Sequence, residues 1–164
     1  MRTIFKLFCL FLLATVCHWI LTTGIHATGW SINMMLAFAI ALCTLLKPAY
    51  GYPLAFLGGL FLDFFSTKLF GANACTFTLV AFTIYSVEDR FDFNGILLQM
   101  GAVFVFTVAA YCMSSLLVRV FTGSILWVGI WRVLGGAAVS ALFAPFVFWF
   151  VRKTVSDGFM CKLR

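Results

Sequence analysis

One acidic residue of the chain lies inside an apolar segment. Asp63 falls within the sequence GGLFLDFF, which contains no other charged residue. An ionisable side chain inside a membrane is costly, so such a residue is the first candidate for a functional role. Going back from Asp63 in steps of four gives three small residues, Gly59, Ala55 and Gly51. Residues at this spacing share one helix face, and small residues let a second helix approach closely. We therefore expect this face and its carboxylate to contact protein.

Two roles are open for Asp63. It can fix the turn that follows, by hydrogen bonding to Ser66 and Thr67 or by pairing with Lys68. It can instead contact a partner protein or a transported group. Arg132, about two turns inside the last apolar segment, is a further candidate partner, because the other four acidic residues are expected on the cytoplasmic side.

A second stripe of small residues lies in the last apolar segment. Gly136, Ser140 and Ala144 are again four apart. Pro145 follows directly, and we expect it to weaken the backbone hydrogen bonding of the helix there. The stripe predicts a helix-packing face, either within the monomer or toward a partner.

The remaining polar residues form no catalytic or metal-binding set. The chain has no G-x-S-x-G, phosphate-binding loop or H-E-x-x-H motif, and no pair of carboxylates at catalytic spacing. Its 6 cysteines include no C-x-x-C pair. His18 and His26 have no neighbouring ligand residues. We therefore expect no catalytic residue, no cofactor and no metal, and conclude that an enzyme is not indicated.

The elements that position these residues must suit a membrane. Of the 164 residues, 64% are hydrophobic and 10% are charged, and the mean hydropathy is +1.12. Soluble domains have roughly 45–50% apolar and roughly 25% charged residues, and a domain this small could not hide so much apolar surface from water. We expect an all-α integral membrane protein, a bundle of six transmembrane helices forming a single domain over residues 1–164. The predicted spans cover about residues 4–23, 30–46, 50–66, 70–87, 95–118 and 125–151.

Basic residues predict the orientation of the spans. With a cytoplasmic N-terminus, the outer segments hold only Lys68 and Arg119, whereas the inner segments hold Arg2, Lys6, Lys47, Arg90, Arg152, Lys153, Lys162 and Arg164. This bias predicts a multi-pass protein with both termini in the cytoplasm. Anionic lipid next to the inner residues accounts for the net charge of +6, so no nucleic-acid partner is expected. A cleaved signal peptide is the less favoured alternative for the first span, since no small-x-small site closes it.

The segment around Asp63 resembles a known family. The rod shape-determining protein MreD family of bacteria carries a glycine four residues before an aspartate in an apolar helix, a serine shortly after it, and a glycine eight residues after it. Gly59, Asp63, Ser66 and Gly71 match this pattern. The length and hydropathy of the chain are also similar to those of the family.

The resemblance continues near the C-terminus, where six mostly apolar residues follow Pro145 and lead to Arg152 and Lys153. It implies a non-enzymatic component of the bacterial inner membrane that helps the cell-elongation machinery organise lateral peptidoglycan synthesis and rod shape. The implied partners are the periplasmic scaffold MreC, the actin-like MreB, a RodA-type glycosyltransferase and a penicillin-binding transpeptidase. The implied fold is similar to that of the substrate-binding subunits of energy-coupling-factor transporters. The residues expected to serve structure or partner contact are Gly59, Asp63, Ser66, Gly71, Arg132, Gly136, Ser140 and Pro145.

The same implied fold leaves one alternative function. A substrate-binding subunit of an energy-coupling-factor vitamin transporter would also be small, apolar and six-helical. Such subunits usually dock through an Ala-x-x-x-Ala pattern in their first helix, but the first span here has only Ala14, and the pattern Ala37-x-x-x-Ala41 occurs in the second. The predicted outer loops are short and poor in polar groups for binding a substrate. We therefore prefer the hypothesis of a role in cell elongation.

Overall fold

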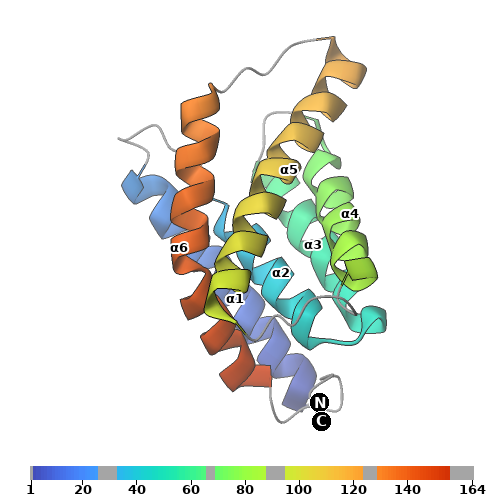
Figure 1. The fold of residues 1–164 in the computed structure, drawn as a ribbon. Coiled ribbons are helices and arrows are strands. Elements are labelled where there is room, and N and C mark those ends of the chain that lie inside the picture. Colours follow the sequence, from blue (N-terminus) through green and yellow to red (C-terminus); the bar gives the residue numbers. More distant parts are fainter. Residues whose placement is uncertain (1, 26–32, 66–68, 88–94, 124–128, 156–164) are drawn as a thin grey trace.

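In the residues that it describes, the computed structural model of the chain is a bundle of six α-helices (Figure 1). The structure describes residues 2–25, 33–65, 69–87, 95–123 and 129–155. The helices are α1 (Arg2–Ile25), α2 (Met34–Leu45), α3 (Pro48–Phe65), α4 (Ala72–Val87), α5 (Ile96–Thr122) and α6 (Ile130–Val155). No β-strand occurs in these ranges, so the expected all-helical architecture is confirmed for them.

Two of these helices, α2 and α6, begin about one turn later than the apolar pattern predicts. Helix α2 begins at Met34, because Asn33 acts as its N-cap and accepts a hydrogen bond from the Leu36 N–H at 3.2 Å. Helix α6 begins at Ile130 rather than near residue 125, because Gly129 has a φ of +82° and so cannot belong to a right-handed helix. Hydropathy does not mark either cap, since it averages over several residues.

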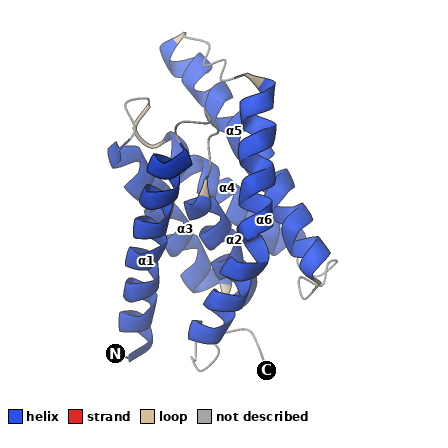
Figure 2. Ribbon diagram, turned by 90° about the vertical axis from the view of Figure 1, so that its left-hand side faces the viewer, coloured by secondary structure: helices blue, strands red, loops and turns tan. Residues whose placement is uncertain are grey.

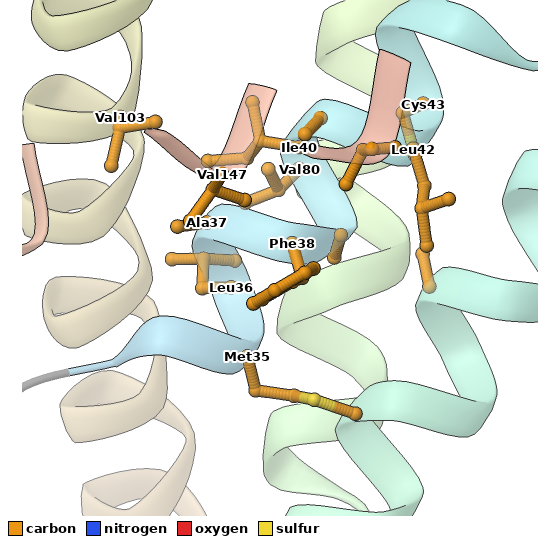
Figure 3. Packing of buried hydrophobic residues seen from close by; sticks show 14 of the residues in the cluster. Met35, Leu36, Ala37, Phe38, Ile40, Leu42, Cys43, Val80, Val103 and Val147 are labelled. Atoms are coloured by element: carbon orange, nitrogen blue, oxygen red, sulfur yellow. The ribbon is translucent and has the colours of Figure 1, made fainter. Parts of the chain in front are cut away.

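Helix α2 lies at the centre of the bundle, although it is the shortest of the described helices. Its 12 residues rise about 18 Å, and all of them except Thr44 are buried. It contacts each of the other five helices. Figure 3 shows Val80 of α4, Val103 of α5 and Val147 of α6 beside the side chains of α2. A helix that is apolar all round is typical of a core position, and the other helices pack around this one.

Helices α5 and α6 are long and apolar enough to cross a membrane. Their 27 and 26 residues each rise about 40 Å, whereas the hydrocarbon of a bilayer is about 30 Å thick. Many of their large apolar side chains are exposed, including Leu97 and Trp131. Helix α6 continues through Pro145 without a break. Both helices are therefore compatible with a place in a membrane.

The direction of the helices defines two ends of the bundle. Helix α1 begins and α6 ends at the same end, which we call the first end (Figures 1 and 2). The connection between α2 and α3 also lies there (Figure 1). The second end carries the end of α3, the start of α4, the end of α5 and the start of α6 (Figure 1). An even number of helices that alternate in direction places the start of the first and the end of the last at the same end of the bundle.

Candidate functional site

Asp63 binds the first turn of α4. It lies in the last turn of α3, and its side chain is only 2% exposed. One carboxylate oxygen, Oδ1, accepts hydrogen bonds from the Asn73 backbone N–H at 3.1 Å and from Asn73 Nδ2 at 3.0 Å. The other oxygen, Oδ2, accepts from the Ala74 backbone N–H at 3.0 Å. The first N–H groups of a helix have no partner within the helix, and that end is electropositive. The carboxylate of α3 therefore caps α4.

Gly59, one turn before Asp63, brings the two helices close enough for this cap. A Cβ atom at Gly59 would lie 2.5 Å from Ala74 Cα and 2.5 Å from the Asn73 carbonyl oxygen. Both of these are backbone atoms, which cannot move aside as a flexible side chain can. At Gly58, by contrast, a Cβ would meet only ordinary contacts, the nearest being Met35 Cε at 3.5 Å. The close approach thus depends on one of the two adjacent glycines.

Gly71 forms the corner between α3 and α4. Its φ is +92°, a left-handed conformation that side-chain-bearing residues rarely adopt. Its carbonyl oxygen accepts the Cys75 N–H at 2.9 Å and so begins the hydrogen bonding of α4. Because glycine has no side chain, it cannot cap the helix itself, and Asp63 supplies the cap from α3. Gly59, Asp63 and Gly71 therefore act together in one helical hairpin.

The stripe of small residues extends this contact toward the first end. Gly51, Ala55, Gly58, Gly59 and Asp63 are the buried residues of α3, so the prediction that this face meets protein is confirmed. A Cβ at Gly51 would collide with the Tyr85 hydroxyl of α4. That hydroxyl donates a hydrogen bond to the Leu46 carbonyl oxygen at 3.2 Å, at the end of α2.

Arg132 is not the partner of Asp63. It is exposed in the first turn of α6, whereas Asp63 is buried against α4. The sequence predicts Arg132 two turns inside a span, and the late start of α6 is the reason for the difference. Arg119 is likewise exposed, in the last turn of α5. Ser66 and Lys68 lie outside the described residues, so their contact with Asp63 stays a prediction.

Sequence reasoning did not identify Asn73 and Ala74 as the partners of Asp63. The start of α4 is less apolar than its surroundings, and Asn73 is the polar residue in it. The distance of ten residues from Asp63 spans a turn, and no helical periodicity connects the two sides of a turn. One sequence pattern could have indicated the cap. It consists of a carboxylate near the end of one helix and a Gly and an Asn at the start of the next.

The second stripe packs inside the bundle. Gly136, Ser140 and Ala144 are buried in α6, which contacts α2. The Ser140 hydroxyl donates to the Gly136 carbonyl oxygen at 2.8 Å and accepts the Asn33 N–H at 3.3 Å. It therefore satisfies a backbone group at the start of α2. Of the two predicted uses of the stripe, packing within the monomer is the one observed.

Other buried polar groups also find partners within the chain. The Thr76 hydroxyl donates to the Ala72 carbonyl oxygen at 2.7 Å and lies 3.3 Å from the Ser114 hydroxyl of α5. The Thr107 hydroxyl donates to the Val103 carbonyl oxygen at 2.6 Å. Within the described ranges no three His, Cys, Asp or Glu side chains group as metal ligands. No disulfide joins Cys9, Cys17, Cys43, Cys75 and Cys112, and the Cys43 thiol donates a hydrogen bond to the Gly51 carbonyl oxygen at 3.9 Å.

The chemistry available at Asp63 is therefore that of a buried hydrogen-bond acceptor that joins two helices. Both oxygens are occupied by α4, and the charge faces the electropositive end of that helix. Comparison of the chain with family models, with curated proteins and with solved structures finds no match.

Proposed function

We propose that the chain is a non-enzymatic component of the bacterial inner membrane that helps the cell-elongation machinery organise lateral peptidoglycan synthesis and rod shape. The observation that carries this proposal is the α3–α4 hairpin. Three of the four residues by which the sequence resembles the MreD family, Gly59, Asp63 and Gly71, serve one structure there. A chance resemblance would be expected to fall on residues with unrelated positions in the fold, whereas these residues act together. Ser66, the fourth, lies outside the described residues.

The membrane placement has separate support. Two helices have the length and composition of membrane spans. Exposed large apolar side chains occur on all the helices except α2, which the others surround. A protein with this surface needs an apolar solvent, and the bilayer provides one. We propose that the bundle crosses the inner membrane with its first end in the cytoplasm, because the basic residues Lys47, Arg152 and Lys153 lie there.

The orientation leads to a first prediction, which reporter fusions can test. A reporter joined at Lys162, or inserted in the segment from residue 88 to 92, should give cytoplasmic activity. A reporter inserted after Gly123, between α5 and α6, should give periplasmic activity, because this position lies at the second end. The control is the same reporter after residue 47, between α2 and α3, which should match the cytoplasmic pair. Periplasmic activity at Lys162 would contradict the six-span arrangement.

The second prediction concerns function. In a rod-shaped bacterium lacking its MreD protein, expression of this chain should restore rods, and the tagged chain should retain an MreC-type scaffold during purification. The reason is that the proposed role is exercised through partners, since the buried side chains of Asp63, Thr76, Thr107 and Ser140 are engaged within the fold. An equally abundant chain with Asp63 replaced by alanine serves as the matched control and should restore rods poorly.

Two outcomes would contradict the proposed function. Round cells at normal membrane abundance of the unaltered chain, with no scaffold retained, would remove the cell-elongation role. Vitamin uptake dependent on the chain would favour the alternative, a substrate-binding subunit of an energy-coupling-factor transporter. That alternative has less support, because Thr76, Thr107 and Ser140 all satisfy their hydrogen bonds within the chain and not toward an open site.

A further inference from the structure

The last turns of α6 combine exposed aromatic and cationic side chains. Lys153 Nζ lies 5.1 Å from the ring centroid of Trp149, a cation–π contact one turn apart on the helix. The ring centroid of Phe146 lies 6.3 Å from that of Trp149. Trp149 is 58% exposed and Phe146 is 64% exposed. Side by side on one helix, these side chains form a strip that is apolar at Phe146 and cationic at Lys153.

The strip lies at the end of the bundle where positive charge gathers. Arg152 precedes Lys153 in the last turn of α6, and Lys47 lies between α2 and α3 at the same end. Asp63 is the one carboxylate among the described residues, and it caps α4 at the second end. Within the described part of the chain, the first end is therefore cationic, and this charge favours a ligand that carries negative charge.

We propose that this face of α6 binds an anionic phospholipid, with the headgroup phosphate at Lys153 and Arg152 and an acyl chain along Trp149 and Phe146. The inference rests on the membrane placement in the proposed function, but not on the role in cell elongation. Tryptophan prefers the interface between hydrocarbon and headgroups, and a long basic side chain reaches the headgroups from there. Basic residues at the cytoplasmic surface attract anionic lipid.

A lipid fits this face better than a soluble phosphate does. A free phosphate ion could meet the charge of Lys153, but it would leave the exposed rings of Trp149 and Phe146 without a partner. A phospholipid supplies the phosphate and the apolar chain at the separation that one helix turn imposes. The position at a helix C-terminus, where the backbone carbonyls repel anions, also means that binding depends on the side-chain cations.

Tryptophan fluorescence in vesicles tests the proposal. One variant keeps Trp149 and has phenylalanine at the other four of the 5 tryptophans. A matched variant keeps only Trp19 of α1, which is 73% exposed and has no lysine or arginine within a turn on either side. Each is placed in phosphatidylcholine vesicles containing a minor fraction of phosphatidylglycerol, with bromine on the acyl chains of one lipid or the other. Bromine quenches only tryptophans that it contacts.

We expect Trp149 to be quenched by brominated phosphatidylglycerol beyond its share of the lipid, with a preference of about fivefold for each engaged cation. Trp19 should be quenched by both lipids according to their abundance. The double substitution R152Q and K153Q in the Trp149 variant should remove the preference. Quenching of Trp149 without any preference would overturn the lipid site. A Trp19 that neither lipid quenches would instead overturn the membrane placement.

A second measurement uses the chain with all its tryptophans, in case the single-tryptophan variants fold poorly. Its thermal unfolding midpoint should be higher in vesicles with phosphatidylglycerol than in phosphatidylcholine alone, and K153Q should reduce that difference. Inorganic phosphate added to phosphatidylcholine vesicles should leave the midpoint unchanged. Equal midpoints in both lipids, or stabilisation by inorganic phosphate alone, would overturn the proposal.

Discussion

Replacement of Asp63 by alanine should destabilise the protein by about 2–4 kcal/mol. The substitution leaves the backbone N–H groups of Asn73 and Ala74 without their acceptors. Each buried group left unsatisfied costs about 1–3 kcal/mol, and loss of a helix N-cap alone costs about 1 kcal/mol. The measurement is the free energy of unfolding in mixed micelles titrated with a denaturing detergent. The first turn of α4 should also exchange its amide hydrogens faster.

Two milder substitutions serve as controls for this result. Asp63→Asn keeps one oxygen acceptor but turns an NH2 group toward an N–H donor. Its free energy of unfolding should therefore lie between those of the unaltered chain and Asp63→Ala. Asn73→Ala removes only the side-chain bond to Oδ1 and keeps both backbone bonds, so it should cost about 1 kcal/mol. If Asp63→Ala proves no more costly than Asn73→Ala, the carboxylate does not cap α4 as described.

The same variant has an expected effect in cells. Asp63→Ala should reach the membrane, because the apolar segments that direct insertion are unchanged, but it should support rod shape poorly. The measurement is complementation of a strain lacking the gene, with membrane abundance determined in parallel. Normal rods at normal abundance would show that the cap is incidental to function, even where the loss of stability is confirmed.

Replacement of Gly59 by alanine should destabilise the protein by about 1–3 kcal/mol, the usual cost of overpacking a tight contact. The added methyl group would lie 2.5 Å from the backbone of α4, so the two helices must separate. That separation also lengthens the hydrogen bonds of Asp63, which depend on the same approach. The free energy of unfolding in mixed micelles again provides the measurement.

The adjacent glycine provides a matched control. A Cβ at Gly58 would have its nearest neighbour at 3.5 Å, an ordinary contact. Since alanine is a better helix former than glycine, Gly58→Ala should be neutral or stabilising by up to about 1 kcal/mol. Both substitutions add one methyl group to the same turn of α3, so they differ only in what the methyl group meets. Equal effects of Gly58→Ala and Gly59→Ala would contradict the close approach at Gly59.

The predictions for the α3–α4 hairpin and for the lipid-binding face of α6 concern separate sites. Asp63 and Gly59 act at the second end through contacts within the chain, whereas Lys153 and Trp149 act at the first end through a ligand. Substitutions at the two ends should therefore have additive effects on stability, as is usual for distant sites. Failure of the lipid inference would leave the account of the hairpin intact.

Several features of the protein were predictable from sequence because they depend on local spacing. The apolar composition indicates helices suited to a membrane, and the apolar runs indicate six of them. The spacing of Gly51, Ala55, Gly59 and Asp63 predicts a face that contacts protein, and the structure confirms the burial of all four residues. Residues four apart share a helix face whatever the fold, so this prediction needs no knowledge of the partner helix.

Only the tertiary structure decided which elements meet. Asp63 binds Asn73 and Ala74 across a turn, and Ser140 lies 107 residues from its partner Asn33. No periodicity links such positions, because their contact depends on how whole helices are placed. Hydropathy also could not assign α2 to the centre, since lipid and protein interior are equally apolar. Short-range spacing thus determined the helices and their contact faces, whereas packing in three dimensions determined the cap on α4 and the core around α2.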